Sequence, residues 1–196
     1  ADCAGRSLRQ IIISIGQSYM AGTFNGIRMD PASGLVFSPA HFTWMDTNHP
    51  AGTPRQGYPI EIQALWQAAL DYLGRVDAPQ ARKSWTKLAA QVRESIADLF
   101  YREELGYLSD CLHAAPGTPA AAATADDALR PNQLFALTLG AVQDQNVVER
   151  VLVACQELIV PGAIRSLADR PVHPELPIIH NGVRVNNPAR PYVGEY

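Results

Sequence analysis

Residues 59–73, PIEIQALWQAALDYL, predict a helix that is apolar on nearly every side. Its apolar positions are Ile60, Ile62, Leu65, Trp66, Ala69 and Leu70. Pro59 suits the start of such a helix, where its missing N–H costs nothing, and Gly74 predicts the end. A helix without a polar face has to be buried all round, so we expect this one in the interior of the protein.

The helix expected next, over residues 79–103, is amphipathic instead. Its apolar face carries Trp85, Leu88, Val92, Ile96 and Leu99, and its polar face carries Lys83, Lys87, Arg93, Glu94 and Asp98. The alternation repeats with a mostly apolar segment at 129–139 and an amphipathic one at 143–159. This order predicts an all-α protein with an inner and an outer ring of helices. An ordinary helical bundle or solenoid is the alternative.

The remaining segments carry weaker signals. Residues 7–20 predict a first helix, and residues 23–40 predict a loop with a short hairpin near 31–34. The Ala/Pro/Gly/Thr-rich stretch after His113 indicates a mobile surface loop without chemistry. Residues 160–196 predict a long irregular loop of the kind that often binds ligands.

Upstream of the apolar helix, the loop of residues 41–58 has the composition of a sugar-binding site. Trp44 and Tyr58 offer flat rings for the apolar face of a sugar, while Asp46 and Arg55 offer polar contacts. The indole next to Asp46 is expected to strip water from its carboxyl and raise its pKa, as a general acid requires. The alternative reading is that Asp46 caps a turn.

Three more polar groups stand on apolar segments. Glu61 lies in the first turn of the 59–73 helix, where an acid favours the helix dipole, and it needs a partner such as Arg55 or a ligand. Arg130, Asn132 and Gln133 form a polar cluster that could bind hydroxyl groups. The pair Asp126 and Asp127 could cap the helix expected to follow.

Composition excludes several other classes. The chain has 196 residues, a net charge of -3, 47% hydrophobic and 18% charged residues, which indicates a folded domain and no nucleic-acid or membrane partner. Cys3, Cys111 and Cys155 are isolated, and His41, His49 and His180 have no metal-like spacing, so no metal is expected. The cysteine pattern favours a reduced, cytoplasmic protein. Motifs for acyl transfer or nucleotide binding are absent from the sequence.

Taken together, several segments resemble the amylo-alpha-1,6-glucosidase module of glycogen debranching enzymes. They are AGTFNGIRMD (21–30), FTWMD (42–46), PRQGYPIEIQALW (54–66), LRPNQ (129–133), PGAIRSLA (161–168) and the segment 187–192. The resemblance covers nearly the whole chain in the order of the family, and the TWMD and PIE motifs are its most specific parts.

The resemblance implies an (α/α)6 barrel and hydrolysis of the α-1,6-linked glucose at branch points of a glycogen-type glucan, with inversion. Asp46 matches the proposed general acid, while Arg55 and Glu61 match positions that line the sugar subsite. Only about half of the barrel is expected within residues 1–196, with the domain cut at both ends and the general base beyond Tyr196. Hydrolysis by two carboxylates needs no cofactor.

Two alternatives remain open on the same residues. One is a related barrel hydrolase of a small glucoside, such as glucosylglycerate. The other is a carbohydrate-binding fragment that retains the aromatic contacts without catalysis.

Overall fold

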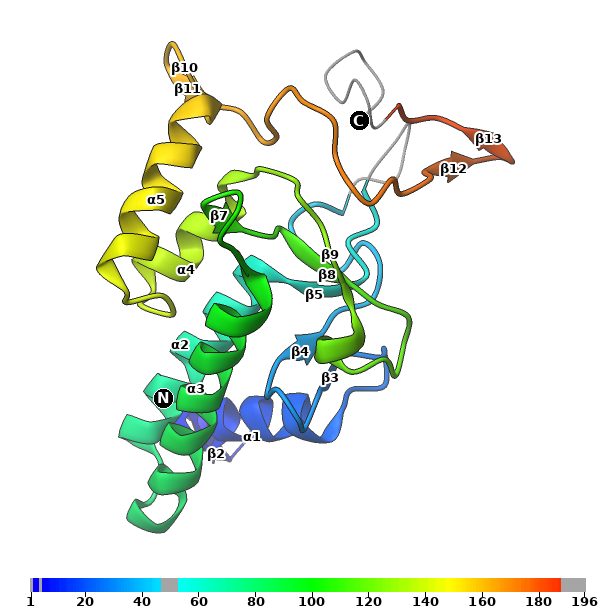
Figure 1. Cartoon of the computed structure of the whole chain (residues 1–196). Coiled ribbons are helices and arrows are strands. Elements are labelled where there is room, and N and C mark those ends of the chain that lie inside the picture. The colour runs from blue at the N-terminus through cyan, green and yellow to red at the C-terminus, as the bar shows by residue number, and fades with distance from the viewer. Residues whose placement is uncertain (1, 4, 47–52, 188–196) are drawn as a thin grey trace.

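A computed structural model describes residues 2–3, 5–46 and 53–187 of the chain (Figure 1). The helices are α1 (Leu8–Ala21), α2 (Ile60–Val76), α3 (Pro79–Phe100), α4 (Leu134–Thr138) and α5 (Gln145–Cys155), with the 3-10 helices η1 (Ala120–Ala122), η2 (Pro131–Gln133) and η3 (Gln156–Leu158).

The described strands are two or three residues long. They are β1 (Asp2–Cys3), β2 (Arg6–Ser7), β3 (Arg28–Met29), β4 (Val36–Phe37), β5 (Gly57–Pro59), β6 (Tyr101–Arg102), β7 (Tyr107–Leu108), β8 (Cys111–His113), β9 (Thr124–Ala125), β10 (Ile159–Val160), β11 (Ala163–Ile164), β12 (Ile179–His180) and β13 (Val183–Arg184). Most of them pair as hairpins, whereas β5, β8 and β9 form a three-stranded antiparallel sheet.

An antiparallel pair of helices, α2 and α3, forms the centre of the fold. Leu70 and Leu73 of α2 and Val92 and Ile96 of α3 are almost completely buried. The sheet of β5, β8 and β9 lies at one end of this pair, and α1 packs near the end where α2 leads into α3 (Figure 1). Helix α4 packs against α2. The described core therefore joins helices and a small sheet.

The prediction of an all-α (α/α)6 barrel is wrong, because the fold is mixed, with several antiparallel sheets. Between the long helices the chain forms hairpins whose strands are too short to show an alternating pattern. The expected inner helix at 129–139 is only a 3-10 turn and the five-residue helix α4. Helix α2 is not buried all round either, since Leu65 and Tyr72 are 48% and 45% exposed.

Gly74 does not end α2, although the sequence predicted that it would. The helix continues to Val76, and the backbone N–H of Asp77 caps it by donating to the carbonyl of Leu73. A Cβ at Gly74 would lie 3.0 Å from the Oγ1 of Thr86 on α3. The glycine therefore allows the close approach of the two helices.

The stretch after His113 is also more regular than expected. It contains η1 and β9, and Leu112 and His113 of β8 pair with Ala125 and Thr124 of β9. This segment therefore belongs partly to the sheet.

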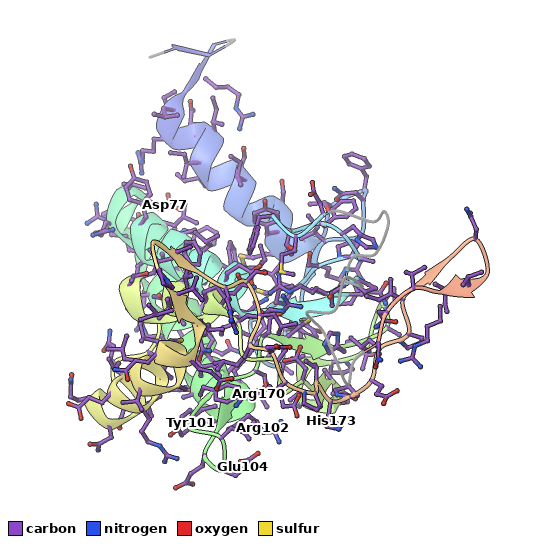
Figure 2. The ribbon with its side chains drawn as sticks, turned by 90° about the horizontal axis from the view of Figure 1, so that it is seen from above. Asp77, Tyr101, Arg102, Glu104, Arg170 and His173 are labelled. Carbon is purple, nitrogen blue, oxygen red and sulfur yellow. The ribbon has the colours of Figure 1, made fainter. Side chains whose placement is uncertain are left out.

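Asp77 connects α2 and α3, on the side of the molecule near α1 (Figure 2). Its carboxylate accepts hydrogen bonds from the Nε1 of Trp85 at 2.7 Å and from the backbone N–H of Ala78 at 2.6 Å. The Trp85 bond, followed by the Ala78 bond, lowers the pKa of Asp77 below its ordinary value.

We expect Asp77→Ala to lower the free energy of unfolding at pH 7 by about 2 kcal/mol, because it leaves the buried Trp85 N–H without an acceptor. Folding lowers the pKa of Asp77 below its ordinary value of about 4. The contribution of its carboxylate to stability is therefore present above that pH and is lost as the pH falls through the folded pKa. In urea titrations, the difference in the free energy of unfolding between variant and wild type should therefore be smaller at about pH 3 than at about pH 5. These two pH values lie about one unit on either side of the ordinary pKa. Glu104→Ala, in an exposed pair with Arg102 (Figure 2), should leave stability unchanged. An equal difference at both pH values would contradict the assignment.

Candidate functional site

The loop of residues 39–56 is closed at its base by backbone hydrogen bonds. Ser38 and Gly57 each donate to the carbonyl of the other, at 2.7 and 3.0 Å. Arg55 lies just before this closure with a φ of 47°, in the left-handed region. Such a conformation costs an L-residue about 1–3 kcal/mol and persists only where other contacts hold it.

Those contacts are two carboxylates that bind the guanidinium of Arg55. Its Nη1 and Nη2 donate to the two oxygens of Glu61 at 2.5 and 2.6 Å. Its Nε and Nη2 donate to the two oxygens of Asp110 at 2.7 and 3.0 Å, and Nη1 also reaches the Oγ1 of Thr43 at 3.1 Å. The prediction that Glu61 needs a partner such as Arg55 is confirmed.

A second arginine approaches the same aspartate. The Nε of Arg130 lies 3.4 Å from the Oδ2 of Asp110, and its other nitrogens donate to the carbonyl of Ser166 and the Oγ1 of Thr53 at 3.1 and 3.3 Å. Two guanidinium groups therefore balance two carboxylates. We call these four side chains the ion cluster: Arg55, Glu61, Asp110 and Arg130.

Burial and charge act in opposite directions within the ion cluster. Burial raises the pKa of the Glu61 carboxyl, and the hydrogen bonds and charge of Arg55 oppose that rise. Burial also works against the charged form of Arg55, but the carboxylates of Asp110 and Glu61 raise its pKa above the ordinary value. Arg55 therefore stays charged, and its two carboxylates are committed to it rather than open to a ligand.

Trp44 and Asp46 lie on the exposed part of the loop. Trp44 is 60% exposed, and its Nε1 donates to the Oδ1 of Asn132 at 3.1 Å. Asp46 is exposed too, so within the described residues its carboxyl is not shielded from water, contrary to the expectation that the neighbouring indole would strip water from it. An exposed aromatic ring and an exposed carboxyl are thus two positions apart in the sequence, and the indole is bonded to Asn132, a partner of Asp110 in the ion cluster.

Asn132 and Gln133 are buried and already bonded within the protein. The Nδ2 of Asn132 donates to the Oδ1 of Asp110 at 2.7 Å. Gln133 accepts a hydrogen bond from the backbone N–H of Leu108 and donates to the carbonyl of Arg130, both at 3.0 Å. The polar groups predicted to bind hydroxyls therefore hold η2 against the rest of the fold.

Tyr58 lies in the core. Its ring packs edge-to-face on Phe37 with centroids 5.9 Å apart, and its hydroxyl donates to the carbonyl of Thr118 at 2.8 Å. Burial raises the pKa of this hydroxyl. Tyr58 also lines a cavity of about 380 Å³ beside β3 and residues 116–119, and none of the ion-cluster residues contributes to that cavity.

Asp126, the residue after β9, supports the ion cluster through contacts at the start of β8. One of its oxygens accepts the backbone N–H groups of Asp110 and Cys111 at 2.8 and 3.3 Å, and the other lies 2.9 Å from the Nε2 of His113. Burial raises the pKa of Asp126, and the bond to His113 opposes the rise. Asp126 thus fixes the backbone of Asp110, just before β8, and the prediction that it caps a helix is wrong.

Asp110 and His113 were not predicted as site residues from the sequence, which suggested a helix cap rather than this role for Asp126. A signal for Asp110 was available, since a carboxylate interrupts the otherwise mostly apolar stretch 107–112. Its partner Arg55 is far away in sequence, however, so the pairing itself leaves no local pattern.

Some predicted features lie outside the described residues, namely 47–52 of the loop, including His49, and 188–192 of the resembling segments. Within the described ranges, every helix is too short or too polar to cross a membrane. The same ranges bring together no group of three His, Cys, Asp or Glu side chains that could hold a metal ion.

An exposed indole, an exposed carboxyl two positions further along the chain and a buried network of charged groups have the chemistry expected of a protein that binds carbohydrate. Residues 4–180 match the amylo-alpha-1,6-glucosidase family, and the chain belongs to that family. The resemblance found in the sequence is confirmed. Membership gives the general activity of a glycoside hydrolase related to glycogen debranching, with a carbohydrate substrate. No curated protein matches the chain in sequence.

Proposed function

We propose that this chain removes α-1,6-linked glucose at branch points of glycogen-type glucans, with inversion, and that Asp46 is the general acid. Family membership supports the reaction class. The observation that carries the assignment of the acid is the contrast between carboxyls. Glu61 and Asp110 are almost fully buried and bound to Arg55, whereas Asp46 is exposed, two positions after the exposed Trp44 in the sequence.

The proposed roles follow from this contrast. A sugar ring stacked on the open face of Trp44 lies next to the Asp46 carboxyl, which protonates the glycosidic oxygen as the bond breaks. Inversion requires a second carboxylate about 6.5–9.5 Å away that activates a water on the opposite face of the sugar. Glu61 and Asp110 act as ion partners in this proposal, and Arg55 and Arg130 hold the loop and η2 in place.

The substrate is an α-glucan or a branched oligosaccharide, and the proposed chemistry uses no cofactor. The thiols of Cys111 and Cys155 are free and buried, which supports a reducing compartment such as the cytoplasm.

We expect Asp46→Asn to lower glucose release from phosphorylase limit dextrin by at least about a hundredfold, the usual contribution of a general acid. Binding of panose, measured by calorimetry, should remain, because the amide keeps the size of the side chain. Asp98→Asn on the exposed face of α3 is the matched control and should retain activity. In the wild type, NMR should show β-glucose as the first product, as inversion requires.

Other outcomes would select the alternatives. Release from glucosylglycerate but not from limit dextrin would favour a hydrolase of small glucosides. Panose binding without any hydrolysis by the wild type would favour a carbohydrate-binding role, and full activity of Asp46→Asn would exclude Asp46 as the acid.

A further inference from the structure

The exposed indole of Trp44 is fixed at one edge. Trp44 is 60% exposed as a residue, yet its Nε1 donates to the Oδ1 of Asn132, a residue that is only 2% exposed. The N–H edge therefore points into the protein while much of the ring remains open. A tryptophan without such a bond would be free to rotate at the surface.

The amide of Asn132 has a defined orientation because of Asp110. An ionised carboxylate only accepts hydrogen bonds, so the group facing the Oδ1 of Asp110 at 2.7 Å must be the Nδ2 of Asn132. The carbonyl oxygen of Asn132 is then left to face the indole N–H. Asp110 thus determines that Asn132 presents an acceptor to Trp44.

Asp110 is itself held by the ion cluster. Arg55 donates two hydrogen bonds to its carboxylate, and Arg130 lies 3.4 Å from one of its oxygens. These contacts and the burial of Asp110, which is 2% exposed, hold its carboxylate in place. A continuous series of contacts therefore runs from the start of α2 to the surface of the loop.

We propose that Asn132 and Asp110 are positioning residues that hold the Trp44 indole with its face open to a sugar ring. This inference rests on the proposed function for the identity of the ligand. It differs from the sequence prediction, in which Asn132 itself binds hydroxyl groups. Because the ring is ordered before the sugar arrives, binding does not have to immobilise it.

The first test needs no ligand and no variant. The indole N–H of Trp44 should exchange slowly with solvent by NMR, although its ring is exposed. The N–H groups of Trp66 and Trp85 are internal references, because they donate to the carbonyl of Gly34 and to Asp77. Exchange of the Trp44 N–H at the rate of a free indole would overturn the proposal.

The second test uses Asn132→Ala, in which exchange of the Trp44 N–H should accelerate by about tenfold or more while Trp66 and Trp85 stay unchanged. Asn146→Ala, at an exposed position of α5, is the matched control and should change none of the three. Unchanged exchange at Trp44 in Asn132→Ala would overturn the proposal, as would equal acceleration at all three tryptophans.

The third test links positioning to binding through a double-mutant cycle. Asn132→Ala should weaken panose binding by about threefold to tenfold, the cost of ordering one side chain. The same change in the Trp44→Phe background should weaken it less than about twofold, since phenylalanine has no N–H to hold. Equal effects in both backgrounds would show that Asn132 acts on the sugar directly and would overturn the proposal. Failure of the wild type to bind panose would instead remove the proposed function, while the exchange tests would still decide the positioning.

Discussion

Arg55→Met is expected to lower the free energy of unfolding by about 3–5 kcal/mol, the usual cost of breaking a buried ion pair by removing one partner. The substitution leaves the carboxylates of Glu61 and Asp110 buried together, and Arg130 alone cannot balance both. It also removes the contacts that hold Arg55 in its left-handed conformation. The loop that carries Trp44 should lose its order, and panose binding should be lost with it. Urea titration and calorimetry measure the two effects.

The pH dependence of this variant follows from the same charges. Burial already raises the pKa of Glu61 in the wild type, and removal of Arg55 leaves that rise unopposed. A carboxyl with a raised folded pKa favours the fold below its ordinary pKa, and this contribution is lost as the pH rises through the folded pKa. The loss in Arg55→Met should therefore be largest at pH 7 and smaller near pH 5, where a neutral carboxyl needs no counter-charge.

Two comparisons make the prediction specific. Arg93→Met breaks a partly exposed pair with Asp71 and should cost at most about 1 kcal/mol. Adding Asp110→Asn to Arg55→Met should recover part of the stability, because one uncompensated charge disappears. Two results would contradict the prediction that Arg55 compensates buried carboxylates. One is a loss of stability in Arg55→Met no larger than that in Arg93→Met, and the other is no recovery of stability when Asp110→Asn is added.

Gly57→Ala is expected to cost about 4 kcal/mol or more, or to prevent folding. Gly57 has a φ of 130°, and a Cβ there would lie 2.1 Å from the carbonyl oxygen of Leu112 and 2.8 Å from the nitrogen of Ala114. Both atoms belong to backbone and cannot turn aside. Strand β5 would have to separate from β8, and Arg55 lies only two residues before the affected position.

Gly117→Ala is the matched control. Gly117 also has a positive φ, of 84°, but a Cβ there would meet nothing within 4 Å. It should therefore show only the cost of the backbone conformation, about 1–3 kcal/mol. Equal losses of stability in the two variants by urea titration would contradict the role given to the contact between β5 and β8.

The long helices were predictable because their signals are local. Trp85, Val92 and Ile96 repeat at helical spacing over 79–103, and this pattern correctly predicts the buried face of α3. The role of a glycine was harder to predict. Gly74 allows α2 and α3 to pack closely and does not end α2, and the sequence alone does not distinguish these two roles.

The mixed fold and much of the candidate site could not be predicted from local patterns. Strands of two or three residues carry too few positions for a period, so the sheet of β5, β8 and β9 could not be seen. The pair Arg55 and Glu61 was predicted because a carboxylate on an apolar helix needs a partner, and Arg55 is only six positions away. Asp110 was missed because its contacts with Arg55 span 55 positions. Trp44 and Asn132 were both singled out, but their contact spans 88 positions and left no trace in the sequence.

These long separations have a consequence for how the protein folds. The ion cluster and the Trp44 contact draw on four segments that are remote along the chain, and closing such loops is entropically costly and slow. The cluster should thus be completed late, after α2 and α3 have paired. A partly folded molecule would hold unpaired charges in place of a binding surface, so the fraction of molecules able to bind sugar should equal the fraction that has folded completely.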